Sequence, residues 1–198
     1  MTRKEEIIFT TLDLASEKGL GAISMNQIAE KIGITKPALY KHFSSKEELI
    51  KEIYSFLKEQ TKKSLSAGQP DYEELFKSAS LKEILKQSVE NYRKICTDPL
   101  MFKFYKVIMS QRTIDKTAAE IMVMETNAML NATKMLFYAL QAKHIADFKN
   151  VDGAALTFAM TVHSIIDYEC DLNQLGLENN QMMNSFIDDF CQLYSPEK

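Results

Sequence analysis

The chain has 198 residues, and 45% of them are hydrophobic, so it can bury a sizeable core and is not disordered. Its formal net charge is −3, which is unusual for a protein that binds nucleic acid. The charged N-terminus is not followed by an apolar stretch, and no run of about eighteen apolar residues occurs. The sequence therefore predicts neither a signal peptide nor a membrane span, and we expect a cytoplasmic protein.

The chain offers little for metal binding or disulfide formation. Its three cysteines are widely spaced and odd in number, which indicates free thiols in a reducing compartment. None of the three histidines belongs to a spaced cluster of His, Cys and carboxylate side chains. We therefore expect neither a metal site nor a cofactor. The residues concerned are Cys96, Cys170, Cys191, His42, His144 and His163.

The first predicted helix covers about residues 3–18. Ile8, Leu12 and Ala15 recur on one face of this segment, which is the spacing of an amphipathic helix with one buried side. Gly19 follows as a C-terminal breaker, since glycine readily adopts the backbone conformation that ends a helix.

Two short helices follow, over about residues 25–32 and 36–42. Ser24 is a suitable N-cap for the first of them, and Thr35 for the second. Gly33 stands between them, where a tight turn needs a residue that tolerates a positive φ.

A fourth, longer helix is predicted to begin at Ser45. Ser45 and Glu48 are spaced as a capping box, in which the Glu48 carboxylate would accept a hydrogen bond from the backbone N–H of Ser45. The helical pattern stops at residues 66–70, which form either a loop within a larger domain or a domain boundary. Beyond them the sequence predicts helices over about residues 81–96, 99–110, 115–144, 152–174 and 179–194.

Two more cap signals support this division into helices. Ser80 and Glu83 form a second predicted capping box, and Asp98 is a predicted N-cap followed by proline. No stretch alternates apolar and polar residues for long enough to indicate a sheet. The sequence therefore predicts an all-α fold.

The positive charge of the chain is concentrated in one short segment. Residues 1–49 hold seven basic and seven acidic side chains, but residues 31–46 hold four lysines and no acid. The acidic remainder of the chain does not cancel this local charge over distances beyond about 10 Å, the screening length at ~0.1 M salt. The four side chains are Lys31, Lys36, Lys41 and Lys46.

Two short helices joined by a glycine-containing turn, with another helix packed across them, are the components of a helix-turn-helix. The second helix would present small or polar groups to a DNA major groove roughly 12 Å wide. Tyr40, Lys41 and His42 could reach phosphates, and Lys46 lies in the first turn of the next helix, where the helix dipole also favours a phosphate. The same pattern also fits an ordinary helical corner with a solvated lysine face.

The order of residues decides between these alternatives. The run Ile28-Ala29-x-x-x-Gly33-Ile34-Thr35-x-x-x-Leu39-Tyr40-x-His42-Phe43-x-Ser45-Lys46-x-x-Leu49 resembles the DNA-binding signature of the TetR family of bacterial transcriptional regulators. The resemblance covers about residues 3–54. Beyond them the chain agrees with the family only in length and helical content.

The resemblance implies a role for individual residues. The residues expected near base edges are Thr35, Lys36, Pro37 and Ala38. The DNA sequence would be recognised by Lys36, by Thr35 and by apolar contacts to thymine methyl groups. Leu39 and Phe43 would be core. The residues expected at the DNA backbone are Ser24, Met25, Gln27, Tyr40, Lys41, His42 and Lys46.

The resemblance also implies a helix-turn-helix domain over residues 1–47 and a larger helical ligand-binding and dimerisation domain over residues 48–198. Small and apolar residues on the last two helices are the expected dimer contacts, unless they are intramolecular core: Ala155, Ala159, Phe186, Ile187 and Phe190. The expected pocket residues, which could equally be core, are Phe102, Tyr105, Met109, Phe137, His163 and Asp167.

We therefore expect a ligand-responsive repressor that binds a palindromic DNA operator as a homodimer and is released by a largely apolar or aromatic small molecule. An enzyme is the first alternative, but the sequence has no nucleophile elbow, no glycine-rich phosphate loop and no metal-ligand spacing. A helical scaffold is the second, although it would not need Tyr40, His42 and Lys46 on one surface.

Overall fold

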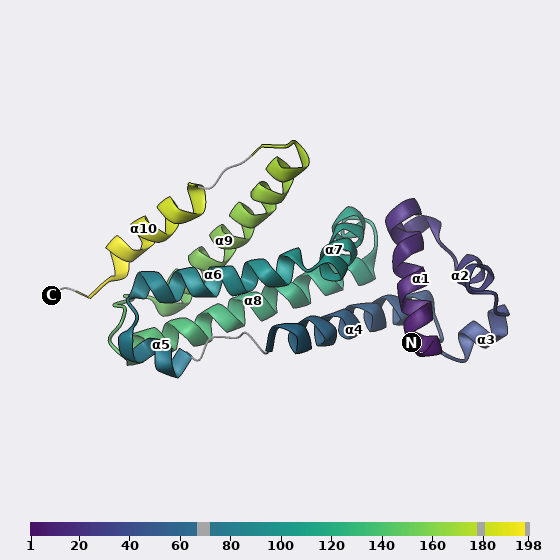
Figure 1. Ribbon diagram of the computed structural model, residues 1–198, viewed down its shortest axis with the longest axis horizontal. Helices are drawn as coiled ribbons and strands as arrows, with labels where there is room; N and C mark the ends of the chain where they lie inside the picture. The colour runs from purple at the N-terminus through teal and green to yellow at the C-terminus, as the bar shows by residue number, and fades with distance from the viewer. Residues whose placement is uncertain (67–71, 178–180, 197–198) are drawn as a thin grey trace. The chain divides into compact units, whose positions relative to one another are not determined.

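The computed structural model describes residues 1–66, 72–177 and 181–196, with side chains described outside residues 61–73 (Figure 1). All regular structure in these residues is helical, which confirms the all-α fold. The elements are α1 (Arg3–Lys18), η1 (Leu20–Ala22), α2 (Met25–Ile32), α3 (Lys36–Tyr40), α4 (Lys46–Ser66), α5 (Tyr72–Ser78), α6 (Leu81–Thr97), α7 (Pro99–Gln111), α8 (Lys116–Ala142), α9 (Val151–Gln174) and α10 (Met182–Tyr194). None of these helices is long and apolar enough to cross a membrane.

Most helices have the bounds that their sequence signals predict, to within about three residues. Two elements were not predicted: the 3₁₀ turn η1 after the first helix, and the short helix α5. The helix α3 ends at Tyr40 rather than His42. Of the predicted break at residues 66–70, Ser66 is the last residue of α4 and the rest lie outside the described residues.

The chain divides into two compact units. One comprises Met1–Ala67 with Ile95–Glu125, and the other comprises Gly68–Lys94 with Thr126–Lys198. The predicted domain division at residue 47 does not coincide with this one, because Leu49 and Ile53 of α4 are buried in the same core as Ile108 of α7.

The core of the first unit is built on α1. Ile8, Leu12 and Ala15 are buried as their spacing predicts, and α1 packs against α2, α4 and α7. Thr11 is also fully buried, and its hydroxyl donates to the carbonyl of Ile7 at 2.7 Å, so no polar group is left unsatisfied there. This core supports the two short helices that carry the candidate site.

The core of the second unit is an aromatic cluster between the end of α8, α9 and α10. Phe137 stacks on Phe148 with ring centroids 4.7 Å apart, and Phe158 meets Phe190 edge-on at 5.0 Å. Such pairs contribute about 0.5–1.5 kcal/mol each beyond the burial of their area. In Figure 1, α9 and α10 lie side by side, in green and yellow.

The start of α4 differs from the predicted capping box in one contact. The Ser45 hydroxyl accepts the N–H of Glu48 at 3.1 Å, as predicted. The Glu48 carboxylate, however, accepts the N–H of Ser44 at 2.7 Å, together with the Ser44 hydroxyl, and not the N–H of Ser45. The later caps, Ser80 with Glu83 and Asp98, are formed as predicted.

Candidate nucleic-acid interface

The helix α2 begins with a reciprocal cap. The Ser24 hydroxyl accepts the N–H of Gln27 at 3.3 Å, and the Gln27 side chain accepts the N–H of Ser24 at 2.8 Å. This satisfies two backbone donors that a helix start otherwise leaves unpaired. Met25, expected near DNA, is 6% exposed and packs in the core, so only its backbone is available to a phosphate.

The turn between α2 and α3 depends on Gly33. This residue has φ 77° and ψ 30°, the left-handed conformation in which a side chain is unfavourable. Its N–H donates to the carbonyl of Glu30 at 3.1 Å, and the N–H of Ile34 donates to that of Ala29 at 3.0 Å. These bonds end α2 and direct the chain into α3.

The helix α3 presents its N-terminal end to solvent. The Thr35 hydroxyl accepts the N–H of Ala38 at 3.3 Å, which fixes the first turn. Thr35, Lys36 and Pro37 are exposed and Ala38 is half-buried, whereas Leu39 on the opposite side is fully buried. The four residues expected near base edges therefore share one end of a short helix whose other face is anchored in the core.

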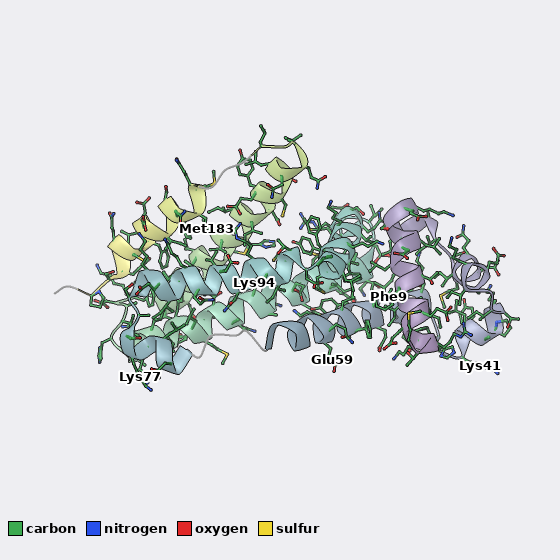
Figure 2. All side chains as sticks on the ribbon, in the orientation of Figure 1. Phe9, Lys41, Glu59, Lys77, Lys94 and Met183 are labelled. Carbon is green, nitrogen blue, oxygen red and sulfur yellow. The ribbon has the colours of Figure 1, made fainter. Side chains whose placement is uncertain are left out.

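Three further residues after this end are exposed. Tyr40 is 42% exposed, and the Lys36 ammonium lies 5.9 Å from the centre of its ring, so the two side chains are neighbours. Lys41 and His42 follow in the turn, where Figure 2 labels Lys41 just after α3. Leu39 and Phe43, at 0% and 1% exposure, are core residues as expected.

The sequence predicts a phosphate contact for Lys46, but in the structure its side chain is half-buried. Its ammonium donates to the backbone carbonyls of Leu20 and Ile23, the second at 2.8 Å, in the connection between α1 and α2. Burial lowers the pKa of Lys46, and the nearby carboxylates of Asp115 and Glu47 act in the opposite direction. Sequence reasoning missed this contact because the acceptors are backbone atoms more than twenty residues earlier.

The six expected pocket residues are divided between the two units. Phe102, Tyr105 and Met109 lie on α7 in the first unit, half-buried, and the last two pack against its core. Phe137 is fully buried in the aromatic cluster of the second unit, as the core alternative predicts.

His163 and Asp167 do lie together on α9, with 3.6 Å between Nε2 and a carboxylate oxygen. The other ring nitrogen of His163 is 2.9 Å from the Tyr92 hydroxyl of α6, and Arg93 of α6 pairs with Glu169, two residues after Asp167. This pair therefore belongs to a polar contact between α6 and α9.

The expected dimer contacts are buried within the single chain. Ala155, Ala159, Ile187 and Phe190 are at most 3% exposed, so they are intramolecular core, and Phe186 is half-buried beside them. A second apolar stripe, with Leu156 and Met160, lies one position further along α9, and helical spacing alone does not show which of the two stripes faces inward. The exposed apolar residues of α9 and α10 include Leu156, Met160, Met182 and Leu193.

No group of three or more His, Cys, Asp or Glu side chains within the described ranges could hold a metal ion. The arrangement at α2 and α3 offers instead a small exposed helix end with adjacent basic side chains. Such a surface is suited to contacts with bases and phosphates.

Comparison with known proteins agrees with this geometry. Residues 7–53 match the family model described as bacterial regulatory proteins, tetR family. The HTH-type transcriptional regulator YerO of Bacillus subtilis is 46% identical over 48 residues, which are 24% of this chain and 17% of YerO. The class C tetracycline repressor protein of Escherichia coli is 35% identical over 48 residues, 24% of this chain and 22% of that one. The chain thus matches about a fifth of the length of these relatives.

The whole fold has a solved counterpart. The flavonoid-responsive regulator FrrA aligns over 98% of both chains with a TM-score of 0.72 and 21% sequence identity. At that identity the likeness concerns the fold, and it extends the agreement from the N-terminal segment to all the helices.

Proposed function

We propose that the chain is a member of the TetR family of bacterial regulatory proteins and acts as a cytoplasmic transcriptional repressor that binds a palindromic operator as a homodimer. A small molecule of largely apolar or aromatic character would release it from DNA. The observation that carries this proposal is the exposed N-terminal end of α3, with Thr35, Lys36 and Pro37 in solvent and Leu39 in the core.

The chemistry of this end matches a major groove. Lys36 and Thr35 supply donors and a hydroxyl for base edges, while Pro37 and Ala38 can only make apolar contacts, for which thymine methyl groups are the available partners. Tyr40, Lys41 and His42, together with the start of α2, would position the unit on phosphates. A scaffold protein would have no use for this combination on one surface.

A homodimer fits both the DNA and the surface of the chain. A helix-turn-helix dimer reads two half-sites about 34 Å apart, which requires two copies. Leu156, Met160, Met182 and Leu193 are 41–74% exposed on α9 and α10, which are neighbours in the second unit. A second copy of the chain packed against α9 and α10 would remove these apolar side chains from water. We therefore assign them to the dimer interface in place of Ala155 and Ala159.

Repression and release are proposed by analogy. One relative is a tetracycline repressor protein, and FrrA, which shares the fold, is a flavonoid-responsive regulator. An effector that binds the DNA-incompetent state more tightly than the DNA-binding state would shift the protein toward the former. The affinity for DNA would then fall because of this difference in effector affinity. Of the predicted effector contacts, the half-buried Phe102, Tyr105 and Met109 remain candidates, whereas Phe137 is core.

DNA binding is tested with labelled duplexes from the region upstream of the protein's own gene. We expect a footprint with two related half-sites and an affinity for it that is about 10³-fold or more above that for random DNA. Equal affinity for both duplexes would refute operator binding.

Dimerisation is tested by sedimentation of the double variant Leu156→Asp/Met160→Asp. We expect the wild-type dimer to become a folded monomer, because charged groups would lie in an apolar interface. Ile114→Asp is the matched control, since Ile114 is 79% exposed in the first unit and lies on neither α9 nor α10. A wild-type chain that sediments as a monomer would contradict this part of the proposal.

Effector release is tested by adding a panel of apolar aromatic compounds to the operator complex. A releasing compound should free the DNA and be recovered chemically unchanged. Turnover of the compound would favour an enzyme instead.

A further inference from the structure

The ammonium of Lys46 joins the beginning of α4 to the connection between α1 and α2. Lys46 is the first residue of α4, and its Nζ donates to the carbonyls of Leu20 and Ile23. Both carbonyls belong to the short segment that leaves α1 at Gly19 and enters α2 at Ser24. One side chain therefore holds two points of the connection that leads into the helix-turn-helix.

The side chains of the same connection are held by the core. The side chains of Leu20 and Ile23 are both 3% exposed. Between them, a Cβ on Gly21 would lie 3.3 Å from the Gln111 side-chain oxygen, so α7 passes close to the backbone there. Apolar packing fixes the side chains, and the ammonium of Lys46 fixes the carbonyls.

A lysine is well suited to this task. Its ammonium has three donors, and hydrogen bonds from a charged group to a carbonyl are shorter and stronger than those between neutral groups. The long stem allows Lys46 to be half-buried while its charge stays near Asp115 and Glu47. With two donors engaged, at most one is left for a phosphate.

We propose that Lys46 is a positioning residue, which sets α2 and α3 relative to α4 and contributes little as a phosphate contact. The inference rests on the proposed DNA binding. Because Ile23 directly precedes the Ser24 cap, a shift of its carbonyl is passed to the start of α2 and through the Gly33 turn to α3. Loss of the ammonium would therefore weaken binding to every DNA sequence without removing a counterion.

The test compares Lys46→Met, which keeps the stem and removes the donors, with Lys41→Met as the matched control. Lys41 is exposed and follows α3, where a phosphate contact is expected. Hydrogen exchange is measured without DNA at the amides of Ala22 and Ser24, which donate to the Gly19 carbonyl and to the Gln27 side chain. Affinity for operator and random DNA is measured as a function of salt. Lys46→Gln replaces Lys46→Met if the latter does not fold.

We expect about tenfold faster exchange at these two amides in Lys46→Met, and unchanged exchange in Lys41→Met. Lys46→Met should lose affinity for operator and random DNA by the same factor with an unchanged salt slope, and Lys46→Arg should recover most of it. Lys41→Met should reduce the slope by about one counterion.

Unchanged exchange in Lys46→Met, or a salt slope reduced by about one, would overturn the positioning role. Failure of the wild-type chain to bind any DNA would refute the proposed function instead, and the exchange measurement would still decide whether Lys46 holds the connection.

Discussion

The phenolic hydroxyl of Tyr54 donates a hydrogen bond to the carboxylate of Glu125, and so ties α4 to α8 within the first unit. Lys58, one turn further along α4, pairs with the same carboxylate. Burial and this carboxylate raise the pKa of Tyr54 above its ordinary value, which further favours the protonated hydroxyl that donates to Glu125.

Tyr54→Phe should lower the free energy of unfolding by about 1.5 kcal/mol. The ring, 7% exposed, keeps its packing, and the loss is that of a hydrogen bond to a charged acceptor. Urea unfolding at pH 7 measures it. Tyr40→Phe is the control, because Tyr40 is exposed on α3, and equal losses in the two variants would contradict the assignment.

Gly33→Ala should cost about 1 kcal/mol of the free energy of unfolding. Its φ of 77° is unfavourable for a residue with a Cβ, and no atom lies within 4 Å of where that Cβ would be, so the cost is conformational and not steric. Gly33→Asn should cost less, because asparagine tolerates this region better. Thermal unfolding of both variants tests the prediction, and a larger cost for asparagine would refute it.

Phe190→Ala should lower the free energy of unfolding by about 3–5 kcal/mol, because it removes the ring that meets Phe137, Phe158 and Tyr194 and leaves a cavity. Leu175→Ala should change it by less than about 0.5 kcal/mol, since Leu175 is 71% exposed. Urea unfolding measures both. A small effect at Phe190 would mean that the cluster is not the core of the second unit.

In Glu48→Gln the free energy of unfolding should change less than in the wild type as the pH falls from neutral into the acid range. The Ser44 hydroxyl and then its N–H lower the pKa of Glu48 below the ordinary 4.5, so the folded state favours the carboxylate. This contribution is present above that ordinary value and is lost as the pH falls through the lowered pKa. The difference in unfolding free energy between wild type and variant should therefore be largest near neutral pH and shrink in acid. In a chain that carries Ser44→Ala, the same difference caused by Glu48→Gln should be smaller at neutral pH. A difference in unfolding free energy that does not depend on pH would contradict the contact between Ser44 and Glu48.

Lys36→Ala should alter the preference among operator sequences. Lys36 is exposed in the first turn of α3, and under the proposed function its ammonium contacts base edges rather than the DNA backbone alone. Binding to a set of operators with single base-pair changes measures this. Equal losses on operator and random DNA would show that Lys36 contacts only phosphates.

The sequence by itself determined the helices and the turn of the candidate interface. Ser24, Gly33 and Thr35 act on backbone groups within a few residues of themselves, so their effect can be predicted without knowledge of the rest of the fold. Leu39 and Phe43 could be assigned to the core for a similar reason, since the helical spacing and the family signature agree about them.

Only the tertiary structure decided which apolar stripe of α9 faces inward. Ala155 with Ala159, and Leu156 with Met160, have the same four-residue spacing, and periodicity cannot rank two stripes one position apart. In the structure the alanine stripe is buried, and Leu156 and Met160 are exposed. The exposed stripe thereby became the proposed dimer surface.

Lys46 shows the same limit at the interface itself. Its sequence position, four residues after His42 and at a helix start, predicts a phosphate contact from local electrostatics alone. Its partners are carbonyls 26 and 23 residues earlier, which the packing of α1 and α4 brings within reach of the ammonium. Local signals set where each helix begins and ends, and long-range packing set which groups those helices present to one another.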